Sequence, residues 1–132
     1  MKSTYIIGEI GQNHNGSVDI AKLLVELVAR PIHEELFQLD LKPMDAIKLT
    51  KRDLSEELSI SQMNRPYDSP HSFGKTYGEH RAYLELSDEE HFEVYKHAKK
   101  YGLDFVETLC AKPLSQRQVL PLSLFLLPVQ VS

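Results

Sequence analysis

The sequence predicts an α/β fold in which parallel strands alternate with helices. Three short segments, residues 4–10, 44–50 and 103–109, have the β-branched and aromatic composition of strands. Two longer segments, residues 18–30 and 88–101, repeat apolar residues at the three- and four-residue spacing of a helix. Strands and helices in this order are joined by right-handed crossovers, so the helices cover the sheet and ligands bind where the strands finish.

The first strand runs directly into a polar loop, GQNHNG, which contains two glycines and two asparagines. We therefore expect the strand to end near Glu9. Ser17 stands where an N-cap belongs, and the helix should continue until Arg30 meets Pro31, because a residue before proline disfavours the helical conformation. The apolar residues that define this helix are Ile20, Leu23, Leu24, Leu27 and Val28.

The second strand, MDAIKLT, places Ile47 and Leu49 on one face and Lys48 on the other. Residues 51–86 follow as a polar stretch rich in Ser, Pro, His and Tyr. This stretch shows no sustained period of either kind, which predicts a long loop. Long loops are uncommon in compact domains and are usually functional or disordered.

The last helix has the clearest boundaries, because Ser87 and Glu90 form a capping box and Gly102 follows its end. The third strand, LDFVETL, comes next and carries Thr108 near its end. Past Ala111 neither period continues and two prolines interrupt the chain. We therefore assign the predicted fold to residues 1–111 and treat residues 112–132 as a divergent apolar tail.

Composition excludes several classes of protein. A chain of 132 residues with ordinary apolar and charged fractions forms one globular domain at most. The net charge of -4 gives no field that would attract nucleic acid. The single cysteine, Cys110, cannot form an internal disulfide, no secretion signal is recognisable, and the apolar run near the C-terminus is too short for a bilayer. We expect a cytoplasmic protein without nucleic-acid or membrane partners.

Two charged residues on the predicted strands are candidates for chemistry. Glu9 lies among isoleucines, where a carboxylate is costly unless it is paired, solvated or functional. Lys48 lies between Ile47 and Leu49, where a lysine could hold a phosphate or carboxylate at the mouth of a barrel. From the pattern alone, a solvated strand-end glutamate and a surface lysine explain these residues equally well.

Other motifs give weaker signals. The GKT stretch at residues 74–76 lacks the glycine and the preceding strand of a phosphate-binding loop, since Ser69 occupies the first glycine position. The six histidines share no metal-ligand spacing. Cys110 is best explained as a buried, inert thiol. His14 follows the first strand and either contacts a substrate or hydrogen-bonds within its own turn.

Four segments together resemble the amino-terminal part of the N-acetylneuraminate (sialic acid) synthase family. They read IIGEIGQNHNGSVDIAK, DAIKLTKRDL, NRPYDSPHSFGKTYGEHRAYLELS and YGLDFVETL. They occur in the family's order and spacing and cover residues 5–111. The resemblance implies a (β/α)8 TIM barrel that condenses phosphoenolpyruvate with an N-acetylmannosamine-type amino sugar, using a divalent metal such as Mn or Mg.

By the same resemblance, Glu9 matches the family's active-site glutamate and Lys48 matches its phosphoenolpyruvate-binding lysine. Asn13 and His14 would line the same mouth, and Lys75 and Tyr77 would contact substrate from a nearby loop. The resemblance assigns no metal ligand to this chain, because the family's metal-binding histidines lie beyond the matching part.

The chain is short for this fold, since a barrel of this type takes roughly 250 residues. We therefore expect a partial barrel, with the first three strands and their helices, from a truncated chain that is inactive alone. Its open strand edges favour aggregation or a homo-oligomer. Two alternatives stay open: a non-catalytic fragment that associates with an intact synthase subunit, and another phosphoenolpyruvate-condensing barrel that acts on an aldose phosphate.

Overall fold

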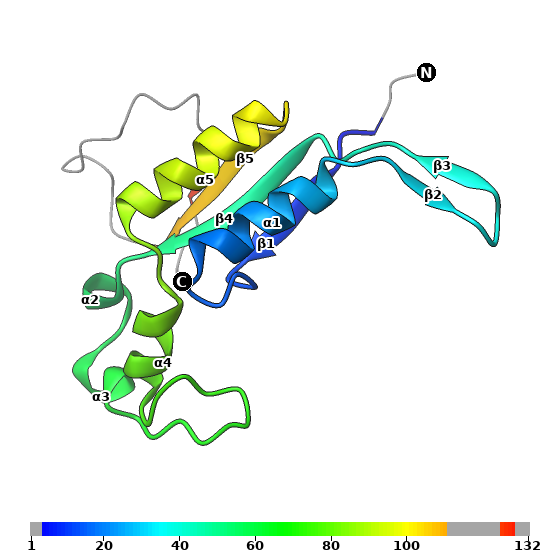
Figure 1. Cartoon of the computed structure of the whole chain (residues 1–132). Helices are drawn as coiled ribbons and strands as arrows, with labels where there is room; N and C mark the ends of the chain where they lie inside the picture. The colour runs from blue at the N-terminus through cyan, green and yellow to red at the C-terminus, as the bar shows by residue number, and fades with distance from the viewer. Residues whose placement is uncertain (1–3, 111–124, 129–132) are drawn as a thin grey trace.

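The computed structural model describes residues 4–110 and 125–128 and contains a parallel sheet covered on one face by two helices (Figure 1). The strands lie in the order β1, β4, β5, β6, and each neighbouring pair is parallel. Their bounds are β1 Ile7–Gly11, β4 Ala46–Arg52, β5 Asp104–Cys110 and β6 Phe125–Pro128. The helices over the sheet are α1 (Val18–Val28) and α5 (Asp88–Lys100). The predicted α/β class with parallel strands is confirmed.

The N-caps of both covering helices lie where the sequence predicts them. Ser17 accepts a hydrogen bond from the N–H of Ile20 at 3.3 Å and begins α1. Ser87 and Glu90 form the predicted capping box of α5, in which each side chain accepts from the other residue's backbone N–H. Three acidic residues in the first turn of α5 and basic residues in its last turn also complement the helix dipole.

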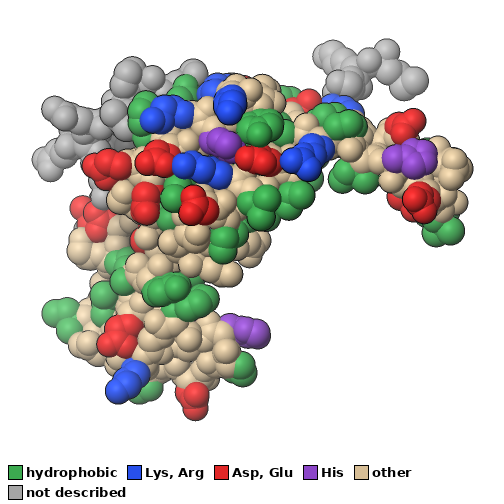
Figure 2. Space-filling view, viewed as in Figure 1, with side chains coloured by type: hydrophobic (Ala, Val, Ile, Leu, Met, Phe, Trp, Pro, Cys, Tyr) green, Lys and Arg blue, Asp and Glu red, His purple; other side chains and the backbone are tan. Residues whose placement is uncertain are grey.

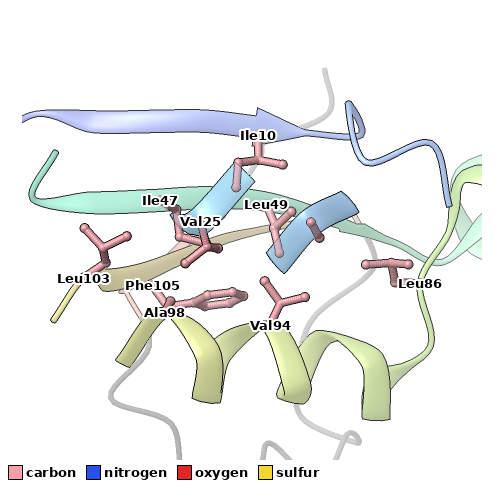
Figure 3. Close-up of a cluster of buried hydrophobic side chains, with 10 residues drawn as sticks. Ile10, Val25, Ile47, Leu49, Leu86, Val94, Ala98, Leu103 and Phe105 are labelled. Carbon is pink, nitrogen blue, oxygen red and sulfur yellow. The ribbon is translucent and has the colours of Figure 1, made fainter. Parts of the chain in front are cut away.

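The hydrophobic core lies between the sheet and these two helices (Figure 3). Ile47 and Leu49 are fully buried there, as their alternation predicts, and Lys48 points to the opposite face. The helices contribute Ala21 and Val25 from α1 and Val94 and Ala98 from α5, among other residues. On α1, however, Ile20, Leu23 and Leu27 stay exposed, so its apolar stripe is only half covered by the described residues.

The prediction of a long loop at residues 51–86 is wrong, because this stretch contains three short helices. They are α2 (Leu54–Glu57), α3 (Ile60–Met63) and α4 (Tyr77–Leu84). Two of them begin with capping boxes, formed by Ser59 with Gln62 and by Thr76 with Glu79. Helices of four to eight residues are too short to show a helical period, so their caps are the only signal that the sequence offers.

The connector between the first two predicted strands forms a hairpin that the sequence analysis does not assign. Strands β2 (Ile32–Glu34) and β3 (Leu39–Leu41) pair antiparallel and project away from the main sheet (Figures 1 and 2). Leu36 and Phe37 at its turn are 79% and 71% exposed. Strands of three residues give too few positions for an alternating pattern.

The predicted tail is only partly described. Its residues 125–128 form β6, a strand that the sequence analysis does not assign, so the sheet has a fourth described strand. Residues 112–124 and 129–132 of the tail lie outside the described residues. No helix in the described part of the chain is long and apolar enough to span a bilayer.

Candidate functional site

The two predicted charged residues are neighbours on adjacent strands. Glu9 of β1 is in register with Lys48 of β4, and the Lys48 Nζ donates to Oε2 of Glu9 in an ion pair. Residues paired in register point to the same face of a sheet. Because Ile47 and Leu49 face the helices, Glu9 and Lys48 lie on the face opposite α1 and α5.

The ion pair is accessible from solvent. The Glu9 side chain is 52% exposed and the Lys48 side chain is 23% exposed. The pairing also shifts between Glu9 and Gly11, an irregularity that bends the strand near its end and re-aims side chains. An exposed pair of this kind contributes little stability but exchanges partners readily. An anionic ligand could therefore take the ammonium group from Glu9 and release the carboxylate.

The same face continues across the sheet on β5. Val106 is in register with Lys48, and Thr108 is in register with Thr50. Thr108 is buried and lies two residues nearer the strand end than Val106. A lysine, a carboxylate and two hydroxyl groups thus occupy one face near the carboxyl ends of three parallel strands.

The loop after β1 places its two predicted residues differently. Asn13 is exposed, whereas His14 is only 1% exposed. The Nδ1 of His14 accepts a hydrogen bond from the N–H of Gly16 at 3.1 Å. Burial, followed by the nearby His91, lowers the pKa of His14. The sequence leaves two interpretations open for His14, contact with a substrate or a hydrogen bond within its own turn. The hydrogen bond from Gly16 corresponds to the second.

Lys75 and Tyr77 lie at the start of α4, on the lobe formed by α2, α3 and α4 (Figure 1). Lys75 is exposed, and its N–H donates to the Glu79 carboxylate at 2.7 Å. Two guanidinium groups lie over the Tyr77 ring, with Arg65 at 5.1 Å and Arg81 at 5.4 Å from its centroid. Within residues 4–110, no hydrogen bond or ring contact joins Lys75 or Tyr77 to the Glu9–Lys48 pair.

The histidines and the cysteine form no metal cluster in the part of the chain that the structure describes. No group of three or more His, Cys, Asp or Glu residues there is arranged to hold a metal ion. His91 instead pairs with Glu107, and His97 pairs with Glu26. Burial raises the pKa of the Cys110 thiol, which keeps it protonated and unreactive near neutral pH.

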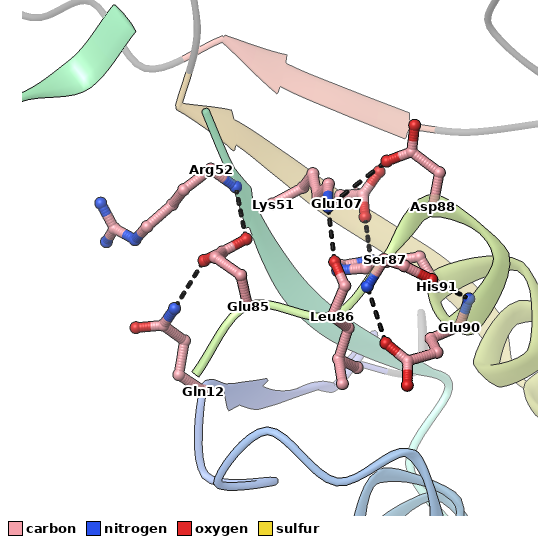
Figure 4. Close-up of polar contacts among 10 residues, drawn as sticks. All are labelled: Gln12, Lys51, Arg52, Glu85, Leu86, Ser87, Asp88, Glu90, His91 and Glu107. Atoms are coloured by element: carbon pink, nitrogen blue, oxygen red, sulfur yellow. Dashed lines mark hydrogen bonds and ion pairs between the residues drawn. The ribbon is translucent and has the colours of Figure 1, made fainter. Parts of the chain in front are cut away.

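The structure contains a polar network at the strand ends that the sequence analysis does not identify. Glu85 lies between the buried Leu84 and Leu86 and contacts Gln12 and the Arg52 backbone (Figure 4). The signal for it is the same as for Glu9, namely a carboxylate between apolar residues. In Glu85 this signal is hidden, because residues 51–86 show no period that would set it apart from a loop.

Comparisons with known proteins agree on one class. Over 103 residues the chain is 37% identical to the N-acetylneuraminate-9-phosphate synthase of Drosophila melanogaster, and the match covers 78% of this chain and 25% of that protein. Over 101 residues it is 36% identical to the N-acetylneuraminate-9-phosphate synthase of Homo sapiens, covering 76% of this chain and again 25% of the relative. No protein-family model matches the chain.

The fold is similar to that of a solved structure. The crystal structure of an N-acetylneuraminic acid (sialic acid) synthetase from Leptospira borgpetersenii serovar Hardjo-bovis, in complex with citrate, matches with a TM-score of 0.53. The match has 18% identity and covers 82% of this chain and 30% of the other.

Fold and sequence thus define the described residues as part of an α/β protein with a parallel sheet. The chain is a partial sialic acid synthase-like sequence, and it spans about a quarter of the length of the curated relatives that it matches.

Proposed function

We propose that residues 5–110 provide the first part of a sialic acid synthase active site, within a (β/α)8 barrel that a longer assembly completes. The complete enzyme would condense phosphoenolpyruvate with an N-acetylmannosamine-type sugar, phosphorylated or not. The observation that supports this proposal most directly is the Glu9–Lys48 pair, which lies on the face of the sheet opposite α1 and α5, in a chain similar in sequence to synthases.

In this proposal Lys48 binds phosphoenolpyruvate. The ligand carries a phosphate and a carboxylate, and a lysine ammonium neutralises such groups as a compact point charge. Binding would move the Lys48 ammonium away from Glu9, with which it is paired in the structure. The Lys48 ammonium is therefore paired with Glu9 before the anion arrives and with the anion afterwards.

Glu9, once released, would hydrogen-bond a hydroxyl group of the sugar or carry a proton during the reaction. A carboxylate that is half exposed at a strand end can take either role, because it is reachable by ligand and by water. Asn13, which is exposed in the loop after β1, would contact the same ligand, and the buried His14 would stabilise that turn through its hydrogen bond with Gly16. Lys75 and Tyr77 would add contacts from the α4 lobe.

The resemblance also implies a divalent metal, Mn or Mg, which would polarise the sugar aldehyde. The described residues do not fit such an ion, since no suitable group of ligands exists among them. We therefore assign no metal ligand to residues 4–110 and place no step of the proposal on a metal.

A chimeric enzyme tests this proposal. Residues 5–110 would replace the matching segment of the Drosophila relative, and phosphoenolpyruvate-dependent product formation would be measured with an amino sugar. We expect Glu9→Gln and Lys48→Ala to lower kcat/KM by about 100-fold or more, the scale of a lost acid–base or anion-binding group. Lys48→Ala should also raise the KM for phosphoenolpyruvate.

Lys100→Ala is the matched control, because it removes the same charge from an exposed position at the end of α5. It should leave turnover unchanged. An active chimera in which Glu9→Gln and Lys48→Ala behave like Lys100→Ala would refute the assigned roles.

A further inference from the structure

The loop after β1 is docked on the end of α4 through three contacts. Gln12 Nε2 donates to Oε1 of Glu85 at 2.8 Å, and Arg81 Nη1 donates to Oε1 of Gln12 at 2.7 Å. At the other end of the loop, Gly16 has a φ of +73°, and a Cβ built there would lie 2.2 Å from the Tyr83 carbonyl oxygen. Residues 12–16 therefore lie against the backbone and side chains of residues 81–85.

Glu85 also reaches the end of a second strand. Its Oε2 accepts from the backbone N–H of Arg52, the last residue of β4, at 3.1 Å. One carboxylate thus joins the loop after β1 to the end of β4, and Figure 4 shows both bonds. Glu9 and Lys48, on the same two strands, lie within a few residues of these contacts.

The hydrogen-bond directions favour an ionised Glu85. Both of its partners, the Gln12 amide nitrogen and the Arg52 N–H, are donors, so each carboxylate oxygen must accept. A proton on either oxygen would compete with a donor for the lone pairs of that oxygen. Reversing the Gln12 amide does not relieve this conflict, because its oxygen already accepts from Arg81. Protonation therefore weakens the network, because hydrogen bonds to a neutral carboxyl are weaker than those to a carboxylate.

The surroundings of Glu85 make that protonation reachable. Burial raises the pKa of Glu85, and the backbone N–H of Arg52 and nearby positive charges offset part of this effect. The groups that act on Glu85 are Lys51 and Arg52 of β4, His91 of α5 and Cys110 of β5, and Arg81 of α4 is linked to it through Gln12.

We propose that Glu85 is a positioning residue that fixes residues 12–16 against the end of β4, and that protonating Glu85 releases this loop. The proposal deepens the proposed function and rests on it, because the loop follows β1 directly after Glu9 and carries Asn13 and His14. Glu85 touches no reacting atom in this scheme. It acts through Gln12 on the loop and through Arg52 on the strand.

NMR spectroscopy of the full chain tests the proposal. The backbone amide signals of Asn13, Gly16 and Arg52 would be followed between about pH 7.5 and 4.5 in the wild type and in Glu85→Gln. We expect the three amides to shift with one common midpoint above the ordinary glutamate value of about 4.3. In Glu85→Gln that midpoint should vanish, and the signals should lie near their low-pH positions at every pH.

Glu89→Gln is the control, since it makes the same change at an exposed position in the first turn of α5. It should titrate like the wild type. A common midpoint that persists in Glu85→Gln would belong to another titratable group and would overturn the proposal. Three amides that shift independently of one another would overturn it as well.

A second titration separates this inference from the proposed function. At about pH 7.5, phosphoenolpyruvate should bind Glu85→Gln about fivefold more weakly than the wild type, the effect of losing one ordering hydrogen bond. Equal affinity for both variants would refute the positioning role. If phosphoenolpyruvate shifts no signal of the wild type, the proposed function fails, and the pH titration still decides whether Glu85 holds the loop.

Discussion

The buried pair formed by His91 and Glu107 provides a direct test of how α5 packs on the sheet. His91 Nδ1 lies 2.5 Å from Oε1 of Glu107, and the two side chains are 8% and 10% exposed. Neither ring nitrogen nor that carboxylate oxygen makes an aligned hydrogen bond. The pair is close enough to attract strongly, but its polar atoms lose their water without gaining well-directed partners.

This geometry sets the expected size of each substitution. His91→Leu should lower the free energy of unfolding by about 3 kcal/mol at neutral pH, because it leaves a buried carboxylate without a counter-charge. Glu107→Leu should cost about 1 to 2 kcal/mol, because it leaves the buried imidazole of His91 without its polar partner. The double substitution should lie within about 1 kcal/mol of the wild type, since apolar residues often replace a buried ion pair without loss.

Urea unfolding of the full chain, followed by far-ultraviolet circular dichroism, measures all four stabilities. Lys22→Ala serves as the control, because Lys22 joins α1 to α5 through an exposed ion pair with Glu93, and losing it should cost less than any of the single substitutions in the buried pair. Single costs that simply add in the double variant would mean that His91 and Glu107 are not coupled. The reasoning that each of these groups stabilises the other would then be wrong.

Three single sites give further predictions. Gly16→Ala should destabilise the chain by about 2 kcal/mol or more in the same urea assay, because Gly16 has a positive φ and an added Cβ would clash with α4. Gly102 has a similar φ but open space around it, so Gly102→Ala should cost about 1 kcal/mol. Cys110 should react with iodoacetamide more slowly than free cysteine at about pH 8, because burial raises the pKa of its thiol, and urea should abolish the difference. A hydrogen bond to Asp104 raises the pKa of Tyr5 to about 12. The stabilisation that this bond gives is therefore complete below about pH 10 and is lost above about pH 12. Asp104→Asn should lower the pKa of Tyr5, measured by ultraviolet titration of the phenol.

The β1 edge of the described sheet bears on whether the isolated chain associates with itself. β1 is an edge strand of the described sheet, and the exposed side of α1 beside it carries Ile20, Leu23 and Leu27. An edge of this kind offers unpaired backbone groups together with apolar side chains. The expectation of self-association therefore stays a prediction, and the dependence of sedimentation on protein concentration would measure it.

Local patterns in the sequence are sufficient for the elements that form the core. Ser17 and Ser87 mark the starts of α1 and α5, and the alternation around Lys48 assigns its face correctly. Each of these features depends on neighbours within four residues, so the sequence carries the signal directly. The resemblance to synthases, too, depends on short motifs in a fixed order.

Contacts between distant groups, in contrast, depend on how the elements pack. Glu9 and Lys48 are 39 residues apart, and Gln12 and Glu85 are 73 apart, so no local period could pair them. The short helix α4 also depends on its surroundings, because eight residues are too few to form a stable helix alone. Local patterns thus specify the parallel α/β layout and its candidate charges, whereas strand register and the docking of α4 determine how those charges are paired and held.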